Sequence, residues 1–136
     1  MFGWGVGDVA SISSLAVNVY TAYKDAPDNY RHISEEVRSL QILLDKAMRQ
    51  IESPSLSDSD RREGREVLKG CQSTLEDLSS LIKEYKSLAS TNKSLVFQKV
   101  KLGTEDISTL RSRLISNTSL LNGFIQRFVE HSCKLL

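Results

Sequence analysis

The side chains that most often carry out chemistry are few in this sequence, and their spacing does not suit a reactive site. The two histidines, His32 and His131, are far apart along the chain, whereas a metal site needs clustered His, Cys or carboxylate ligands. His131 and Cys133 lie two residues apart, which puts them on different faces of a helix. No serine or cysteine stands in a local signature with a histidine base and an orienting acid. We therefore expect no metal, no cofactor and no enzymatic activity.

The glycines and cysteines point to no further site. Gly3, Gly5 and Gly7 alternate just before a helical stretch but follow no strand, so they do not make the phosphate-binding loop of a nucleotide-binding fold. A flexible lead into the helix is their simplest role. Cys71 and Cys133 are too few for the disulfide framework of a secreted domain. We expect both to be buried or free thiols in a reducing cytosol.

Length and composition indicate one all-α domain. The 136 residues include 18 Lys and Arg against 17 Asp and Glu, for a formal charge of +1. This length suits a single core, so we expect one domain over residues 1–136. The balanced charge lacks the clustered Lys and Arg by which nucleic-acid binders hold phosphates, and we expect no nucleic-acid partner. With 40% hydrophobic residues but only 2 Pro and 7 Gly, the composition favours long helices over short strands.

Apolar residues recur at steps of three and four in four segments of the chain, which is the spacing of amphipathic helices. We predict helices over residues 6–24, 28–52, 58–89 and 94–133. The first helix ends before Pro27, because proline cannot continue a helical ladder but suits the first turn of the next helix. Four such helices joined by short connections predict an antiparallel four-helix bundle with up-down-up-down topology. The predicted core consists of Val37, Leu40, Leu44, Leu75, Leu78, Ile82, Leu110, Leu114, Leu121 and Phe124.

Two positions interrupt the apolar stripe of the last predicted helix. Gly103 is costly in a helix interior, and the acidic residues after it are typical of a new helix start, so a kink or split near Gly103 stays open. Asn117 stands where an apolar residue is expected. Buried asparagines of this kind set register or oligomeric state in coiled coils. The simpler alternative is an amide bonded to a neighbouring backbone group or to water.

The first predicted helix is unusual because residues 9–23 carry no charge. A bundle helix that faces water normally has Lys and Glu on its polar side, but here that side consists of Ser, Asn and Thr. Either other helices surround this one and exclude charge, or it leaves the bundle and lies in a membrane interface, where Trp and Phe anchor well. The stretch is too short and too polar for a permanent membrane span. The candidate membrane-active residues are Phe2, Trp4, Val6, Val9, Ile12, Leu15, Ala16, Val19, Tyr20 and Tyr23.

The C-terminal third of the chain holds an excess of positive charge. Residues 91–136 carry seven Lys and Arg against three Asp and Glu, a net charge of +4. Near an anionic leaflet each such residue contributes about 1 kcal/mol, so anionic membrane lipids or an acidic partner would suit this region. The alternative is an ordinary solvated helix face. The candidate basic patch consists of Lys93, Lys99, Lys101, Arg111 and Arg113.

Several motifs are spread over the whole chain. After the N-terminal glycines, an uncharged Val-Ala-Ser-Ile-Ser-Ser-Leu-Ala-Val run leads to Tyr-Lys-Asp-Ala-Pro and then to Glu35-Glu36-Val37-x-x-Leu40. Later, Lys99-Val100-Lys101 is followed by Asp106-Ile107-x-x-Leu110-Arg111-x-Arg113-Leu114 and by Leu120-Leu121-Asn122-x-Phe124-Ile125. Together these motifs resemble the N-terminal domains of fungal STAND/NLR receptors, the HeLo-like group.

The resemblance implies a helical bundle akin to the executioner domain of mixed lineage kinase domain-like protein and to the coiled-coil domains of plant NLRs. It implies a domain that precedes a nucleotide-binding module in a larger receptor and is cytoplasmic at rest. On self-association, such domains act on the plasma membrane through the N-terminal helix and cause regulated cell death, as in fungal innate immunity and heterokaryon incompatibility. The alternative is a non-toxic adaptor bundle that binds its own kind through an outer patch on the helices at 28–52 and 58–89.

Overall fold

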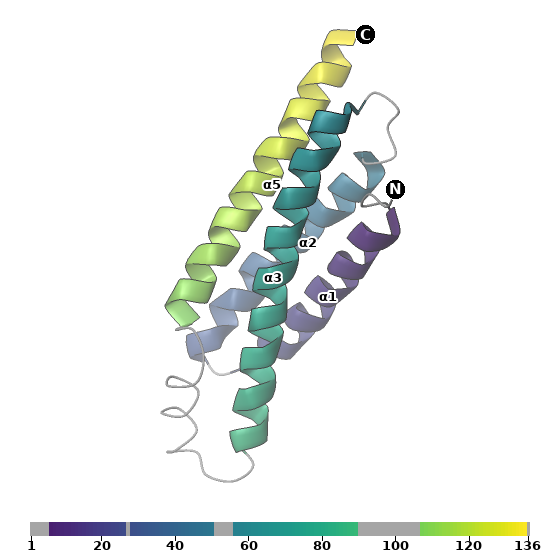
Figure 1. The fold of residues 1–136 in the computed structure, drawn as a ribbon. Coiled ribbons are helices and arrows are strands. Elements are labelled where there is room, and N and C mark those ends of the chain that lie inside the picture. The colour runs from purple at the N-terminus through teal and green to yellow at the C-terminus, as the bar shows by residue number, and fades with distance from the viewer. Residues whose placement is uncertain (1–5, 27, 51–55, 90–106, 136) are drawn as a thin grey trace.

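The computed structural model describes residues 6–26, 28–50, 56–89 and 107–135, and the regular structure in these ranges is helical (Figure 1). The helices are α1 (Val6–Lys24), α2 (Asp28–Gln50), α3 (Asp58–Ala89) and α5 (Ile107–Leu135). These described ranges contain no strand. The all-α class is therefore confirmed, and the arrangement of the four helices is compatible with a helical bundle.

The helix boundaries follow the predicted ones closely. Helices α1 and α3 have the predicted bounds, and α2 begins at residue 28 as expected and ends at Gln50. Helix α5 runs to Leu135, two residues beyond the predicted end at 133. The predicted start of that helix at 94 and the predicted kink at Gly103 lie outside the described residues.

Local signals explain the ends of two helices. The Ser57 hydroxyl accepts a hydrogen bond from the backbone N–H of Asp60 (3.1 Å), and the Ser57 carbonyl accepts one from Arg61 (3.0 Å). Ser57 is therefore the N-cap of α3, and Asp58 and Asp60 suit the positive end of its dipole. At the end of α1, the N–H of Ala26 donates to the carbonyl of Tyr23 (3.1 Å) and closes the turn.

Each helix packs against two others. Helices α1 and α5 both pack against α2 and α3, and Figure 1 shows α1 and α5 on opposite sides of the bundle. Hydrogen bonds join Ser13 to Asp45 between α1 and α2, and Asn117 to Thr74 between α5 and α3. Within the described part of the chain, α1 is thus held by two neighbours and is not enclosed.

The predicted core residues are buried with one exception. Phe124 is only half-buried, and Ile125 is buried in its place. A straight α-helix drifts relative to a strict alternation of three and four, so the inward position near the end of this seam has moved on by one residue. The Phe124 ring lies against Gly64 of α3, where an added Cβ would come within 2.7 Å of it. The prediction for Phe124 is therefore wrong.

Candidate functional site on helix α1

The inner face of α1 is part of the bundle core. Val9, Ile12, Ala16, Val19 and Tyr23 are at most 2% exposed, as the apolar stripe predicts. Among the other candidate membrane-active residues, Leu15 and Tyr20 are half-buried and pack against the core. Phe2 and Trp4 lie outside the described residues, as does the side chain of Val6.

Tyr23 connects α1 to α3 in the centre of the bundle. Its phenol O–H donates to the backbone carbonyl of Leu78 (2.7 Å), and its ring meets that of Tyr30 edge-on at a centroid distance of 6.3 Å. Burial, with a smaller electrostatic contribution from Tyr30, raises the pKa of the Tyr23 phenol well above its ordinary value of 10.0. The phenol therefore stays protonated and acts as a hydrogen-bond donor. A tyrosine in an apolar stripe is a sequence signal for such a contact, since a buried O–H needs an acceptor.

Two side chains at the flank of α1 bind it to α2. The Ser13 hydroxyl donates to the Asp45 carboxylate (2.8 Å). On the next turns, the Arg38 guanidinium lies 5.7 Å from the centre of the Tyr20 ring and 3.5 Å from its hydroxyl oxygen. Sequence reasoning placed Ser13 and Tyr20 on α1 but named no partner for either. These contacts and the Tyr23–Leu78 bond hold α1 against α2 and α3.

The outer face of α1 is exposed and uncharged. We define it as Ser11, Ser14, Val17, Asn18 and Thr21, all of which are exposed, with Val17 at 41%. The lack of charge on α1 therefore does not come from enclosure by the other described helices. The sequence left two explanations open, enclosure by other helices and entry into a membrane interface. Enclosure by the described helices does not account for this face. No helix in the described ranges has the length and hydropathy needed to cross a bilayer.

The two described residues of the candidate basic patch are engaged in separate ion pairs. Arg111 donates to Glu36 of α2 (2.7 Å), whereas Arg113 donates to Asp77 of α3 (2.8 Å) and to the hydroxyl of Ser73 (3.3 Å). Arg111 and Arg113 therefore face different neighbours. The other three patch residues, Lys93, Lys99 and Lys101, lie outside the described residues.

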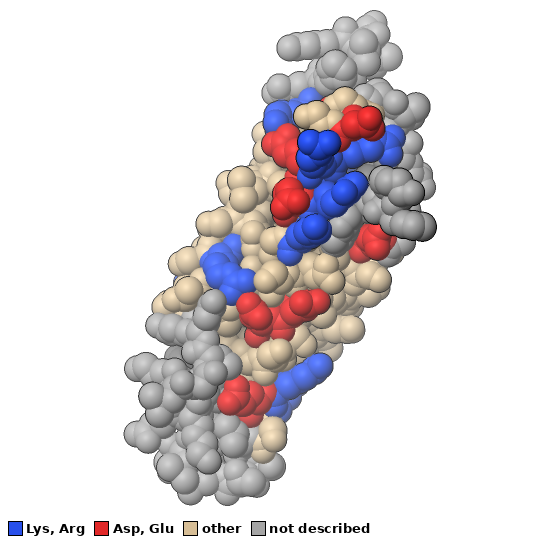
Figure 2. Space-filling model, in the orientation of Figure 1, with Lys and Arg blue, Asp and Glu red and all other residues tan. Residues whose placement is uncertain are grey.

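Charges of both signs share the visible surface of the bundle. Figure 2 shows Lys and Arg beside Asp and Glu over α3, with no broad area of one sign among the coloured residues. Within the same described ranges, no three His, Cys, Asp or Glu side chains gather in a way that could hold a metal ion. The described surface offers contact faces, and the outer face of α1 is one that carries no charge.

Asn117 connects α5 to α3. Its amide donates to the backbone carbonyl of Gly70 (3.1 Å) and to the hydroxyl of Thr74 (2.5 Å), and Thr74 is only 1% exposed. Gly70 allows this approach, because an added Cβ there would lie 3.0 Å from the Asn117 amide oxygen. The half-buried amide is thus satisfied by the neighbouring helix, and a shift of α5 along α3 would break both bonds.

Replacing Asn117 with alanine should lower the free energy of unfolding by about 1–3 kcal/mol, because it leaves the buried Thr74 hydroxyl without its partner. Denaturant unfolding of Asn117→Ala, Thr74→Val and the double variant measures this effect and its coupling. The double variant should lose less than the sum of the single losses. Ser116→Ala, an exposed neighbour on α5, should change stability by less than about 0.5 kcal/mol. Additive losses would show that the Asn117–Thr74 bond contributes nothing.

Comparisons of this chain with protein-family models, with curated proteins and with solved structures find no match.

Proposed function

We propose that this chain is an effector domain of an NLR-type receptor, which self-associates on activation and causes cell death by acting on a membrane through α1. One observation carries the proposal: the inner face of α1 is apolar and sheltered, while its exposed outer face has no charge. A helix that stays in water gains solubility from Lys and Glu. On a helix that must also enter the acyl region of a bilayer, each such charge costs free energy. The resemblance to HeLo-like domains supports the same function.

The arrangement that we infer for the bundle allows α1 to move. Contacts pair Ser13 with Asp45 and Tyr20 with Arg38, which supports an α1–α2 hairpin with opposite chain directions. In the same way, Asp77 pairs with Arg113 and Glu63 with Arg127 (2.5 Å), which supports an antiparallel α3–α5 hairpin. The chain direction then alternates down and up along the sequence. Release of α1 would leave the contacts between α3 and α5 unbroken.

Release of α1 needs a driving force, since it exposes the apolar residues of the inner face. Clustering by a downstream nucleotide-binding module would supply it by favouring the released state in every copy at once. The freed helix would lie deep in the interface, where its uncharged outer face meets lipid as well as its apolar face. Lys93, Lys99 and Lys101 would meet anionic headgroups there. The domain would accordingly be cytoplasmic at rest and at the plasma membrane on activation.

An adaptor function is the second candidate. A non-toxic bundle that binds its own kind would need an apolar contact on its outer helices, and Ile42 of α2 is 50% exposed. Such an adaptor would not use the outer face of α1. Substitutions on that face therefore separate the two functions.

Charges on the outer face of α1 should abolish membrane activity and spare the fold. We expect Ser14→Glu with Asn18→Glu to reduce vesicle leakage by about tenfold or more, because carboxylates oppose insertion into lipid. The assay uses the domain clustered through an inducible oligomerisation tag, with vesicles of phosphatidylcholine and phosphatidylserine. Both positions are exposed in the bundle, so thermal stability should change by less than about 0.5 kcal/mol. Killing of cells by the clustered domain should fall in parallel.

A matched control carries the same two charges elsewhere. Ser80→Glu with Ser116→Glu places carboxylates at exposed positions on α3 and α5 and should leave leakage and killing unchanged. Deletion of residues 1–24 is a poorer test, because it also removes core residues of the bundle. Equal killing by the α1 variant and the parent would reject the membrane function in favour of the adaptor.

A further inference from the structure

The surface over the seam between α2 and α5 is uncharged and partly apolar. Two of the four large hydrophobic side chains that are well exposed among the described residues meet here, Ile42 of α2 and Ile115 of α5, each 50% exposed. Both line a hollow of about 620 Å³. Exposed isoleucines grouped in this way are typical of a surface that a partner covers. We call this surface the α2–α5 face and define it as Ser39, Ile42, Leu43, Ile115, Thr118, Ser119 and Asn122.

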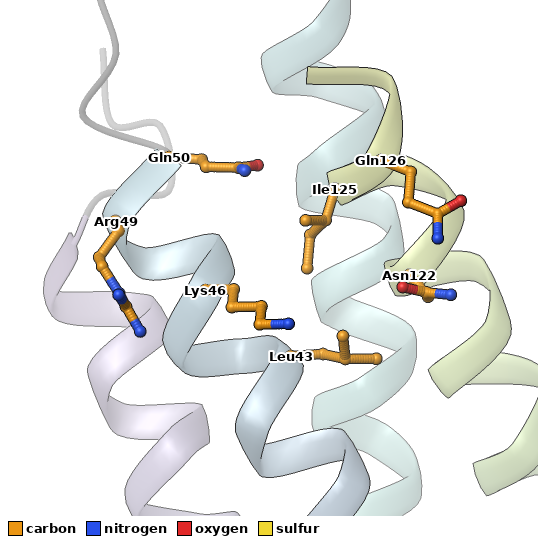
Figure 3. Close-up of a pocket in the computed structure, with 7 residues that line it drawn as sticks. All are labelled: Leu43, Lys46, Arg49, Gln50, Asn122, Ile125 and Gln126. Carbon is orange, nitrogen blue, oxygen red and sulfur yellow. The ribbon is translucent and has the colours of Figure 1, made fainter. Parts of the chain in front are cut away.

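The size of the α2–α5 face suits a weak contact. A second hollow adjoins the first and shares Leu43 with it, and Figure 3 shows Leu43 and Lys46 of α2 reaching there toward α5, and Ile125 of α5 reaching toward α2. On α2 the two hollows extend from Glu36 to Gln50. At about 21 Å long and two helices wide, the surface offers about 400 Å² per copy. Stable complexes bury about 800 Å² per partner, so we expect a contact that forms only when its partners are concentrated.

The two isoleucines stand at nearly the same height on the bundle. The ion pair between Arg111 and Glu36 (2.7 Å) sets α5 beside α2, and the two helices run in the same direction in the arrangement inferred above. Ile115 lies four residues after Arg111, and Ile42 lies six residues after Glu36, so their heights differ by about 3 Å. A twofold axis parallel to the helices would therefore place Ile42 of each copy against Ile115 of the other. Such a pairing closes after two copies.

We propose that the α2–α5 face binds the α2–α5 face of a second copy of this chain, in a parallel dimer with four isoleucines at its centre. The charges around this centre are complementary. Glu35 is exposed and lies seven residues before Ile42, about two turns away on the same side of α2. In the dimer it would meet Arg111 of the second copy, whose side chain is 50% exposed. Lys46 would lie over the neutral Ser119 of that copy.

Other pairings of two copies fit the same surface less well. An axis perpendicular to the helices would place α2 on α2, with Ile42 at the centre. Arg38 would then face Lys46 of the other copy, and these like charges, both exposed, would repel each other. Leu120 is 59% exposed, but it lies about 140° around α5 from Ile115. A contact between Leu120 and the α2–α5 face would join two different patches and build an open chain of copies.

Sedimentation equilibrium of the 136-residue chain tests the proposal. We expect a monomer in dilute solution and a dimer as the concentration approaches about 1 mM. Ile42→Ser with Ile115→Ser should raise the dimer Kd by about tenfold or more, and Glu35→Lys should raise it as well. Leu120→Ser is the matched control, because it removes an exposed apolar side chain outside the face, and it should leave the Kd unchanged. Thermal melts establish that each variant folds.

Disulfide trapping tests how the two copies are arranged. One protein carries Ile42→Cys, and the other carries Ile115→Cys and a tag that changes its size. Both carry Cys133→Ser, and Cys71 is buried. After mixing and mild oxidation, the disulfide between positions 42 and 115 should exceed each symmetric disulfide by about fivefold or more, because only facing side chains come within bonding distance.

Three results would overturn the proposal. A wild-type chain that stays monomeric at about 1 mM would assign the α2–α5 face to another protein. An excess of the symmetric disulfide at position 42 would show α2 packed on α2. Loss of the dimer on Leu120→Ser would indicate an open chain of copies. The proposal deepens the self-association on which the proposed function rests, but its test uses neither lipid nor cells. A dimer without vesicle leakage would therefore reject only the membrane function, and leakage without this dimer would reject only this face.

Discussion

Replacing Tyr23 with alanine is expected to lower the free energy of unfolding by about 3–5 kcal/mol, the range found when a buried aromatic side chain is truncated. Tyr23 is 0% exposed, contacts Tyr30 edge-on and donates to the Leu78 carbonyl. The substitution therefore leaves a cavity between α1 and α3 and removes their shared hydrogen bond. Urea unfolding followed by circular dichroism measures the loss.

Tyr23→Phe separates the ring from the hydroxyl. It keeps the packing and should cost only about 0.5–1.5 kcal/mol for the lost hydrogen bond. Because burial raises the phenol pKa above 10.0, the unfolded chain releases this proton at a lower pH than the folded chain does. The contribution of Tyr23 is thus complete below pH 10 and is lost as the pH rises above it. Tyr23→Phe should flatten this alkaline loss. Equal slopes for the two proteins would show that Tyr23 is not buried as its protonated form.

A covalent tether between α1 and α2 is expected to abolish vesicle leakage and cell killing altogether. Ser13→Cys with Asp45→Cys replaces two side chains that are 2.8 Å apart at their oxygens. A short bismaleimide can therefore link the two thiols without moving either helix. A tethered α1 cannot leave the bundle, so clustering no longer delivers it to lipid. Leakage is compared before and after linkage of the same clustered protein.

The tether experiment needs a defined set of thiols. Burial raises the pKa of the Cys71 thiol to about 12, which keeps it protonated and unreactive toward maleimide at neutral pH. Cys133→Ser is included in every variant. A control tether joins Ser73→Cys with Arg113→Cys, whose parent side chains lie 3.3 Å apart between α3 and α5. The protein with this control tether should cause as much vesicle leakage as the unlinked protein does. Full vesicle leakage caused by the protein with the α1–α2 tether would exclude release of α1 as the mechanism.

The helices themselves were predictable because their signals are local. The alternation of three and four, with Pro27 as a stop, predicted the bounds of α1 and α3. The same spacing also identified the buried face of α1. Phe124 was wrongly predicted to be buried, because each step along a regular helix adds a small rotation that the strict alternation ignores.

The candidate site was predictable only in part. The missing charge on α1 is visible in the sequence, but whether that side is enclosed depends on how many helices surround it. Arg111 and Arg113 belonged to one basic patch by composition, yet they pair with different helices. Asn117 was marked as unusual by its position, while its partners, Gly70 and Thr74, lie more than forty residues earlier.

By itself, the sequence determined the all-α class, the extent of α1 and α3, and the apolar face of each stripe. Only the tertiary structure decided that Tyr23 bonds Leu78 and that the outer face of α1 is exposed. The difference has a physical cause. An apolar stripe repeats within one or two helical turns, so it can be recognised from residues close together in the sequence. Which helices pack against each other depends instead on many weak contacts between distant segments, and no single contact is strong enough to predict the packing.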